Sequence, residues 1–188
     1  MTILEAIDIA KGRINGILAS RQSGAQTLYN IWGGWEKWLQ GSIILAFHGV
    51  PFRISQEDNI YRDGAQKSAD FVFQLNDAVQ RPDANAPPDT CVVELKAVTV
   101  NQSASAFRDL VRDDVIKLTG RLTLQVGNTI GVGRLMIAVT VPAKPLPNDV
   151  IERSERFVTD AGGTGFEVRT ELLGGTFLVY YIFWLQGV

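Results

Sequence analysis

The chain has 188 residues, of which 46% are hydrophobic and 20% are charged, a composition typical of one folded domain and not of a disordered protein. No apolar run is long enough for a membrane-spanning helix, and the first residues lack the basic start and apolar core of a secretory signal, so we expect a cytoplasmic protein without a membrane partner. The net charge of −2 argues against nucleic-acid binding through bulk electrostatics, although a local basic groove is compatible with it.

The first part of the chain is predicted to form two helices. Residues 3–20 place apolar side chains at helical spacing and define an N-terminal helical segment over residues 1–26. A second helix is predicted over residues 27–47, with Gly33-Gly34 as a point of interruption.

The middle of the chain is predicted to contain four strands and one helix. Apolar, β-branched and aromatic runs bounded by turn residues predict strands over residues 52–62, 69–75, 91–100 and 133–141, and a helix is expected over residues 104–118. Because a strand, a helix and another buried strand follow one another, part of the sheet should be parallel. We therefore predict an α/β fold with a mixed central sheet and helices on both faces.

The C-terminal part, residues 142–188, is predicted to form a short helix and a β-hairpin. Asn148 or Asp149 is expected to cap the helix, and the hairpin strands are expected over residues 166–172 and 176–184. The last strand is apolar on both faces, so it needs cover on both sides. The N-terminal helix or a second copy of the chain can supply that cover, and we favour a homodimer with this hairpin or that helix at the interface.

Three charged residues lie in or beside otherwise apolar strands. Glu94 and Lys96 are two residues apart, so on one strand they point to the same face. Burying a charge is costly unless it has a partner or a metal. Asp70, near the start of the preceding predicted strand, can supply a second carboxylate, and two carboxylates with water suit Mg²⁺. The adjacent lysine can orient a water or stabilise charge on a phosphate.

This arrangement resembles the PD-(D/E)XK nuclease superfamily, which has the restriction-endonuclease-like fold. In that superfamily an Asp near the start of one strand is followed by Glu-x-Lys in the next, and here these are Asp70, Glu94 and Lys96. The residue before the Asp is Ala69, a position that varies in the superfamily. The resemblance covers residues 28–141, which we regard as the nuclease-like core within a single domain of residues 1–188.

The resemblance implies a Mg²⁺-dependent nuclease that hydrolyses phosphodiester bonds, with DNA as the favoured nucleic acid and Mn²⁺ able to replace Mg²⁺. Asp70, Glu94 and the carbonyl of Leu95 would hold the metal, and Lys96 would position the attacking water. Glu36 is a further catalytic candidate, because many members carry an acidic residue on the helix before the first strand.

Nucleic-acid contacts are expected on and beside the helix over residues 104–118. Gln102 precedes this helix, and Arg108 and Arg112 share one stripe of it. Lys117 is the fourth candidate, with Asp113 as its expected i,i+4 partner. We assign Asp109, Asp113 and Asp114 to a solvated helix face.

Each residue also has a plainer interpretation. Glu94 and Lys96 can be an ordinary pair on a solvated strand face, Asp70 can end a turn, and Glu36 can face solvent. At the level of function, the alternatives are a catalytically inactive scaffold or interaction subunit with the same fold, or a nuclease toxin domain.

Overall fold

The computed structural model describes residues 3–20, 27, 29–30, 35–46, 52–58, 60–61, 68–75, 90–122 and 132–186. Its fold is α/β, as predicted. In chain order the elements are α1 (Ile3–Ser20), α3 (Trp35–Ala46), β1 (Phe52–Asp58), β2 (Ala69–Leu75), β3 (Thr90–Ala97), α4 (Ala104–Leu118), β4 (Val132–Thr140), α5 (Asn148–Asp160), β5 (Thr164–Leu173) and β6 (Phe177–Gln186).

The strands form one mixed sheet in the order β1-β2-β3-β4-β6-β5. Strands β3 and β4 are parallel and are connected through α4, whereas every other neighbouring pair is antiparallel. This confirms the predicted parallel crossover. Both β3 and β4 are almost entirely buried, which explains their continuous apolar sequences.

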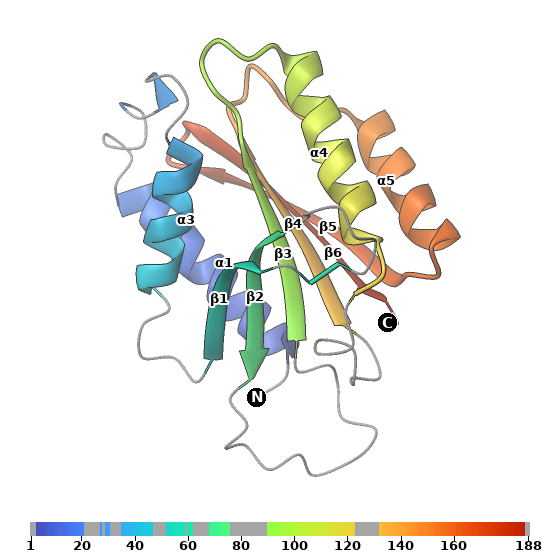
Figure 1. Cartoon of the computed structure of the whole chain (residues 1–188). Helices are drawn as coiled ribbons and strands as arrows, with labels where there is room; N and C mark the ends of the chain where they lie inside the picture. Colours follow the sequence, from blue (N-terminus) through green and yellow to red (C-terminus); the bar gives the residue numbers. More distant parts are fainter. Residues whose placement is uncertain are drawn as a thin grey trace.

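Helices cover both faces of the sheet (Figure 1), with α4 and α5 side by side on one face and α1 and α3 on the other. The buried side chains of α4, namely Phe107, Val111, Val115 and Leu118, recur at helical spacing and face the sheet. On the opposite face, the indole of Trp35 in α3 donates a hydrogen bond of 2.7 Å to the carbonyl of Val98. This bond fixes α3 beside the end of β3.

Strand β6 is covered within the chain, so its apolar faces do not require a dimer. Tyr181 donates a hydrogen bond of 2.6 Å to Asn15 of α1. Trp184 points to the other face, where Gly163 packs against both its indole and Val158 of α5. Both apolar faces of β6 are therefore buried without a second copy of the chain.

Several element ends differ from those expected. The N-cap position of α5 is Pro147, because Asn148 and Asp149 already lie in the helix. Strands β1 and β3 end earlier than predicted, at Asp58 and Ala97. The predicted break at Gly33-Gly34 lies outside the described residues. None of the helices described here is both long and apolar enough to cross a membrane.

Candidate functional site

Strand β3 extends beyond its neighbour β2, and this leaves part of one edge open. The pairing between the two strands covers only the four residue pairs from Phe71 with Val93 to Gln74 with Thr90. On its other side, β3 pairs with β4 from Cys91 to Ala97. Residues 94–97 of β3 therefore have no strand partner on the side of β2.

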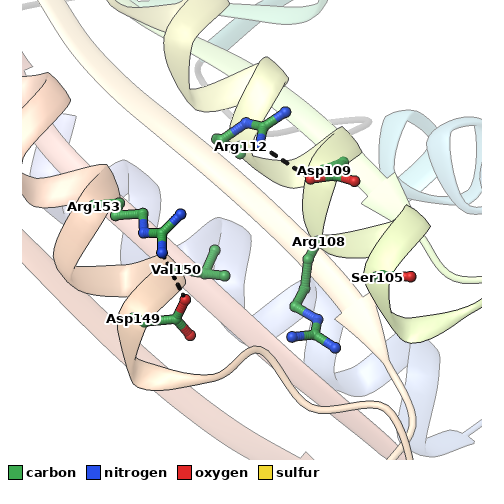
Figure 2. Close-up of a pocket in the computed structure, with 7 residues that line it drawn as sticks. All are labelled: Ser105, Arg108, Asp109, Arg112, Asp149, Val150 and Arg153. Atoms are coloured by element: carbon green, nitrogen blue, oxygen red, sulfur yellow. Dashed lines mark ion pairs between the residues drawn. The ribbon is translucent and has the colours of Figure 1, made fainter.

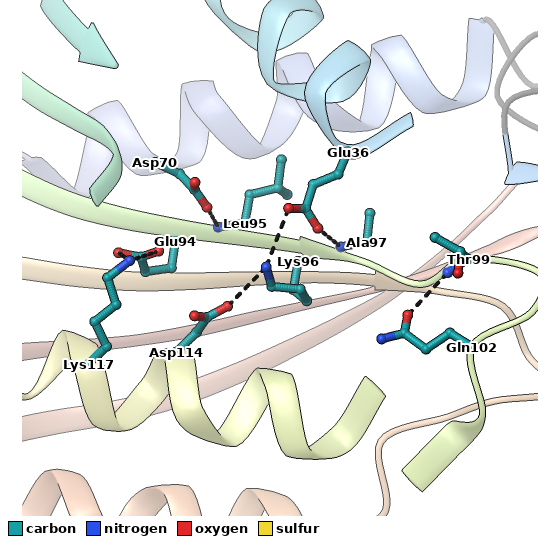
Figure 3. Close-up of polar contacts among 10 residues, drawn as sticks. All are labelled: Glu36, Asp70, Glu94, Leu95, Lys96, Ala97, Thr99, Gln102, Asp114 and Lys117. Atoms are coloured by element: carbon teal, nitrogen blue, oxygen red, sulfur yellow. Dashed lines mark hydrogen bonds and ion pairs between the residues drawn. The ribbon is translucent and has the colours of Figure 1, made fainter. Parts of the chain in front are cut away.

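Two carboxylates accept the backbone donors along this open edge (Figure 3). Oδ2 of Asp70 accepts the N–H of Leu95 at 2.8 Å, and Oε2 of Glu36 accepts the N–H of Ala97 at 2.9 Å. Because buried backbone donors need acceptors, these side chains take the place of the missing strand bonds. The structure thus brings Asp70 and Glu36 to the strand that carries Glu94 and Lys96.

Lys96 lies between two carboxylates that come from opposite sides of the sheet. Its Nζ is 3.3 Å from Oε1 of Glu36 on α3 and 3.5 Å from Oδ2 of Asp114 on α4. Burial lowers the pKa of Lys96, but the charges of Asp114 and Glu36 outweigh burial and raise it above the ordinary value. Lys96 is therefore a fixed positive charge at neutral pH and not a proton acceptor.

Glu94 is buried, with only 2% of its side chain exposed. The ammonium of Lys117 lies 2.8 Å from each of its carboxylate oxygens, and the hydroxyl of Tyr61 donates to Oε1 at 3.2 Å. Burial and the nearby charge of Asp70 raise the pKa of Glu94 to about 8, although Lys117 acts in the opposite direction. Metal coordination requires the ionised form, so a cation bound here would have to displace the proton.

The polar side chains around the open edge of β3 form one cluster, made up of Glu36, Asp70, Glu94, Lys96, Asp114, Lys117 and Tyr61. The sequence interpretation missed two of its members, Asp114 and Tyr61. The assignment of Asp114 to a solvated face was wrong, because its side chain is only 17% exposed and burial raises its pKa. Asp114 is seven residues after Phe107 and four before Leu118, so its place in the apolar stripe was a readable signal. Tyr61 forms an isolated bridge with Leu122, and no sequence pattern marks it.

The expected pair between Asp113 and Lys117 is also absent, because Lys117 turns inward to Glu94. Asp113 instead accepts a hydrogen bond of 3.1 Å from Arg112. Asp113 and Lys117 are only four residues apart, but their side chains project toward different surroundings. The buried carboxylate of Glu94 is the stronger partner for Lys117, since Glu94 has few other groups to neutralise its charge.

Arg108 and Arg112 do not join the cluster. They line a pocket between α4 and α5, together with Arg153 (Figure 2). Arg112 is 3.1 Å from Asp109, and Arg153 is 3.5 Å from Asp149. If Arg108 and Arg112 bind nucleic acid as predicted, they bind it at the pocket between α4 and α5 and not at the cluster around β3.

Gln102 lies in the loop that connects β3 to α4. Its Oε1 accepts the N–H of Thr99 at 3.3 Å, so the side chain closes the loop. The ammonium of Lys144 donates to the carbonyls of Thr99, Val100 and Gln102 at 3.2, 2.9 and 2.7 Å. These contacts hold the loop in place beyond the end of β3.

The cluster has the donors that a hard divalent cation prefers. Because the N–H and C=O of one strand residue point to the same edge, the carbonyl of Leu95 lies on the open edge together with its N–H, which Asp70 accepts. Two carboxylates, one carbonyl and water form a suitable ligand set for Mg²⁺. Within the described ranges, no three His, Cys, Asp or Glu side chains converge to hold a metal ion, so water would have to complete the coordination.

Comparisons of the chain with family models, curated proteins and solved structures found no significant match. The chemistry of the site is therefore inferred from its own geometry. The cluster contains the acids Glu36, Asp70, Glu94 and Asp114 and the lysines Lys96 and Lys117. Once Glu94 has lost its proton, the four acids exceed the two lysines, and this excess of negative charge favours a cation.

Proposed function

We propose that the chain is a Mg²⁺-dependent nuclease with a restriction-endonuclease-like core, acting on nucleic acid with DNA as the favoured substrate. The observation that carries the proposal is the open edge of β3. There, Asp70 accepts a hydrogen bond from the residue that follows Glu94, and Glu36 binds Lys96. The element order α3, β1, β2, β3, α4, β4 also agrees with the order expected from the resemblance.

The roles follow from charge and position. Asp70, Glu94 and the carbonyl of Leu95 would hold the cation. A bound Mg²⁺ would supply Lewis acidity toward the phosphate and lower the pKa of a coordinated water. Lys96 stays protonated, so it would orient the attacking water by donating to it and would stabilise negative charge on the phosphate. Glu36 would keep the ammonium of Lys96 in place through their contact at 3.3 Å.

The direct test uses substitutions that keep shape and remove charge or chemistry. Purified Asp70→Asn, Glu94→Gln and Lys96→Met proteins are incubated with plasmid, linear DNA and RNA, with and without Mg²⁺ or Mn²⁺. Asp113→Asn is the matched control, because Asp113 is an exposed acid on α4. We expect metal-dependent cleavage by the natural chain and the control, and a loss of at least about a hundredfold in the three variants. Asp70→Asn protein that cuts at the natural rate would refute the mechanism.

A second candidate function is a non-catalytic scaffold of the same fold. The observation that favours it is the contact between Lys117 and both oxygens of Glu94, which neutralises the buried carboxylate without a metal. Titration with Mn²⁺ separates the two functions. The nuclease requires binding that is lost in Asp70→Asn, whereas the scaffold predicts no binding at millimolar metal.

A further inference from the structure

We propose that Lys117 is an exchangeable cation whose ammonium occupies the metal-binding side of Glu94 and must leave before a divalent ion can bind there. The inference rests on the metal site of the proposed function. It adds a regulatory step to that site, because the affinity for metal would be set by competition with a side chain of the same protein.

The contact between Lys117 and Glu94 has the geometry of such a competitor. Nζ is 2.8 Å from both carboxylate oxygens, so it lies on the side of the carboxylate where a cation would be coordinated. Hydrogen bonds between charged groups at this distance are strong. A metal ion and an ammonium cannot both occupy that side, since each needs the same oxygen lone pairs.

The two partners differ in their freedom to move. The side chain of Lys117 is 20% exposed, whereas that of Glu94 is 2% exposed. The lysine ammonium also lies 5.7 Å from the centre of the Tyr61 ring, a partner that it can keep or lose at little cost. Lys117 can therefore withdraw toward water, while Glu94 stays buried and requires another cation.

The second lysine of the cluster is held in a different way. Lys96 contacts Glu36 and Asp114, whereas the acids proposed to hold the metal are Asp70 and Glu94. Lys117 has an ion pair, among the described residues, with Glu94 alone. Binding of a metal to Glu94 would thus release Lys117 and leave Lys96 in position.

The test measures Mn²⁺ binding rather than cleavage. Binding isotherms are recorded by the electron paramagnetic resonance of free Mn²⁺ for the natural chain, Lys117→Met, Lys117→Gln and Lys117→Arg. The pH is kept above the pKa of Glu94, about 8, so that protons do not replace the ammonium as competitor. Arg156→Met on α5 is the control for loss of one positive charge at an exposed position.

We expect Lys117→Met and Lys117→Gln to bind Mn²⁺ at least about tenfold more tightly than the natural chain, because a charge-assisted hydrogen bond no longer opposes the metal. Lys117→Arg and the control should resemble the natural chain. The melting temperature of Lys117→Met should also rise more on addition of Mn²⁺, since the metal rescues an unpaired buried carboxylate. Lys117→Gln keeps a hydrogen-bond donor for Glu94, so the experiment can still be read from this variant if Lys117→Met does not fold.

The outcomes separate this inference from the proposed function. Equal or weaker Mn²⁺ binding after loss of Lys117 would overturn the inference while leaving a metal-dependent nuclease intact. Binding by Lys117→Met but not by the natural chain would support the inference and contradict the nuclease. An absence of binding in every protein would overturn both.

Discussion

Lys96 on β3 and Asp114 on α4 are joined by an ion pair, with Nζ of the lysine 3.5 Å from Oδ2 of the aspartate. Glu36 contacts the same ammonium at 3.3 Å from the other side. A lysine side chain is long and flexible, and two opposed carboxylates restrict its position more than one does. The pair therefore connects Asp114, which the sequence interpretation assigned to a solvated helix face, to the centre of the candidate site.

The first prediction concerns Asp114→Asn. The charge of Asp114 is the largest factor raising the pKa of Lys96, so its removal should lower that pKa. If Lys96 acts as a fixed cation, we expect cleavage to fall about tenfold and the alkaline limb of the pH–rate profile to move to lower pH. Asp113→Asn, on the exposed side of the same helix, should change neither. An unchanged profile with a reduced rate would indicate a merely structural role for Asp114.

The second prediction is a pH dependence of stability caused by Glu94. Its pKa is about 8 in the folded chain, compared with 4.5 for an unperturbed glutamate. Between these values the folded state keeps a proton that the unfolded state has lost, so this contribution to stability falls as the pH rises from 4.5 to 8. The slope should be about 1.4 kcal/mol per pH unit within this window. The free energy of unfolding in urea, measured without metal, gives the slope.

Glu94→Gln isolates this effect, because the amide does not titrate. The natural chain should lose stability relative to Glu94→Gln as the pH rises, and the difference should level off above the pKa of Glu94. Glu155→Gln, an exposed position on α5, provides a control that should follow the natural chain. Parallel pH profiles for the natural chain and Glu94→Gln would show that Glu94 ionises normally.

The third prediction separates the two bonds of Glu36. Glu36→Ala leaves the buried N–H of Ala97 without its acceptor, which should lower the free energy of unfolding by about 1–3 kcal/mol. Glu36→Gln keeps an acceptor for that N–H but loses the charge beside Lys96, so it should be destabilised less. Urea unfolding of both variants at one pH provides the measurement. Equal stability of the two would mean that water replaces the side chain at Ala97.

Much of the sheet could be predicted because its strands are local patterns. The continuous apolar runs around Glu94 and in β4 indicated buried strands, and the helix between them required a parallel pair. That Asp70 lies beside the strand that carries Glu94 and Lys96 could be expected from the order of the strands. Their catalytic and metal-binding roles stay predictions.

The parts that could not be predicted depend on tertiary register. The point at which β2 leaves β3 is set by packing between strands, so the bond from Leu95 to Asp70 had no local signal. The partner of Lys117 was misassigned because a sequence shows helix neighbours but not buried acids on a distant strand. Which of the two possible covers β6 has was also open for a similar cause: α1 and α5 cover it from opposite ends of the chain, and the homodimer stays a prediction that this cover does not require.

The last prediction concerns the arginines of α4. Arg108 donates through Nε to the carbonyl of Ala104, and no ion pair involves it among the described residues, whereas Arg112 is engaged by two aspartates. If nucleic acid follows this helix, Arg108→Ala should weaken binding to catalytically inactive Asp70→Asn protein more than Arg112→Ala does. It should also reduce the slope of log affinity against log salt by about one unit, since one phosphate contact is lost. Fluorescence anisotropy with a labelled duplex in EDTA measures both quantities, with Arg156→Ala as control. If all three arginine variants bind with one affinity and one salt slope, the nucleic acid does not contact the pocket between α4 and α5.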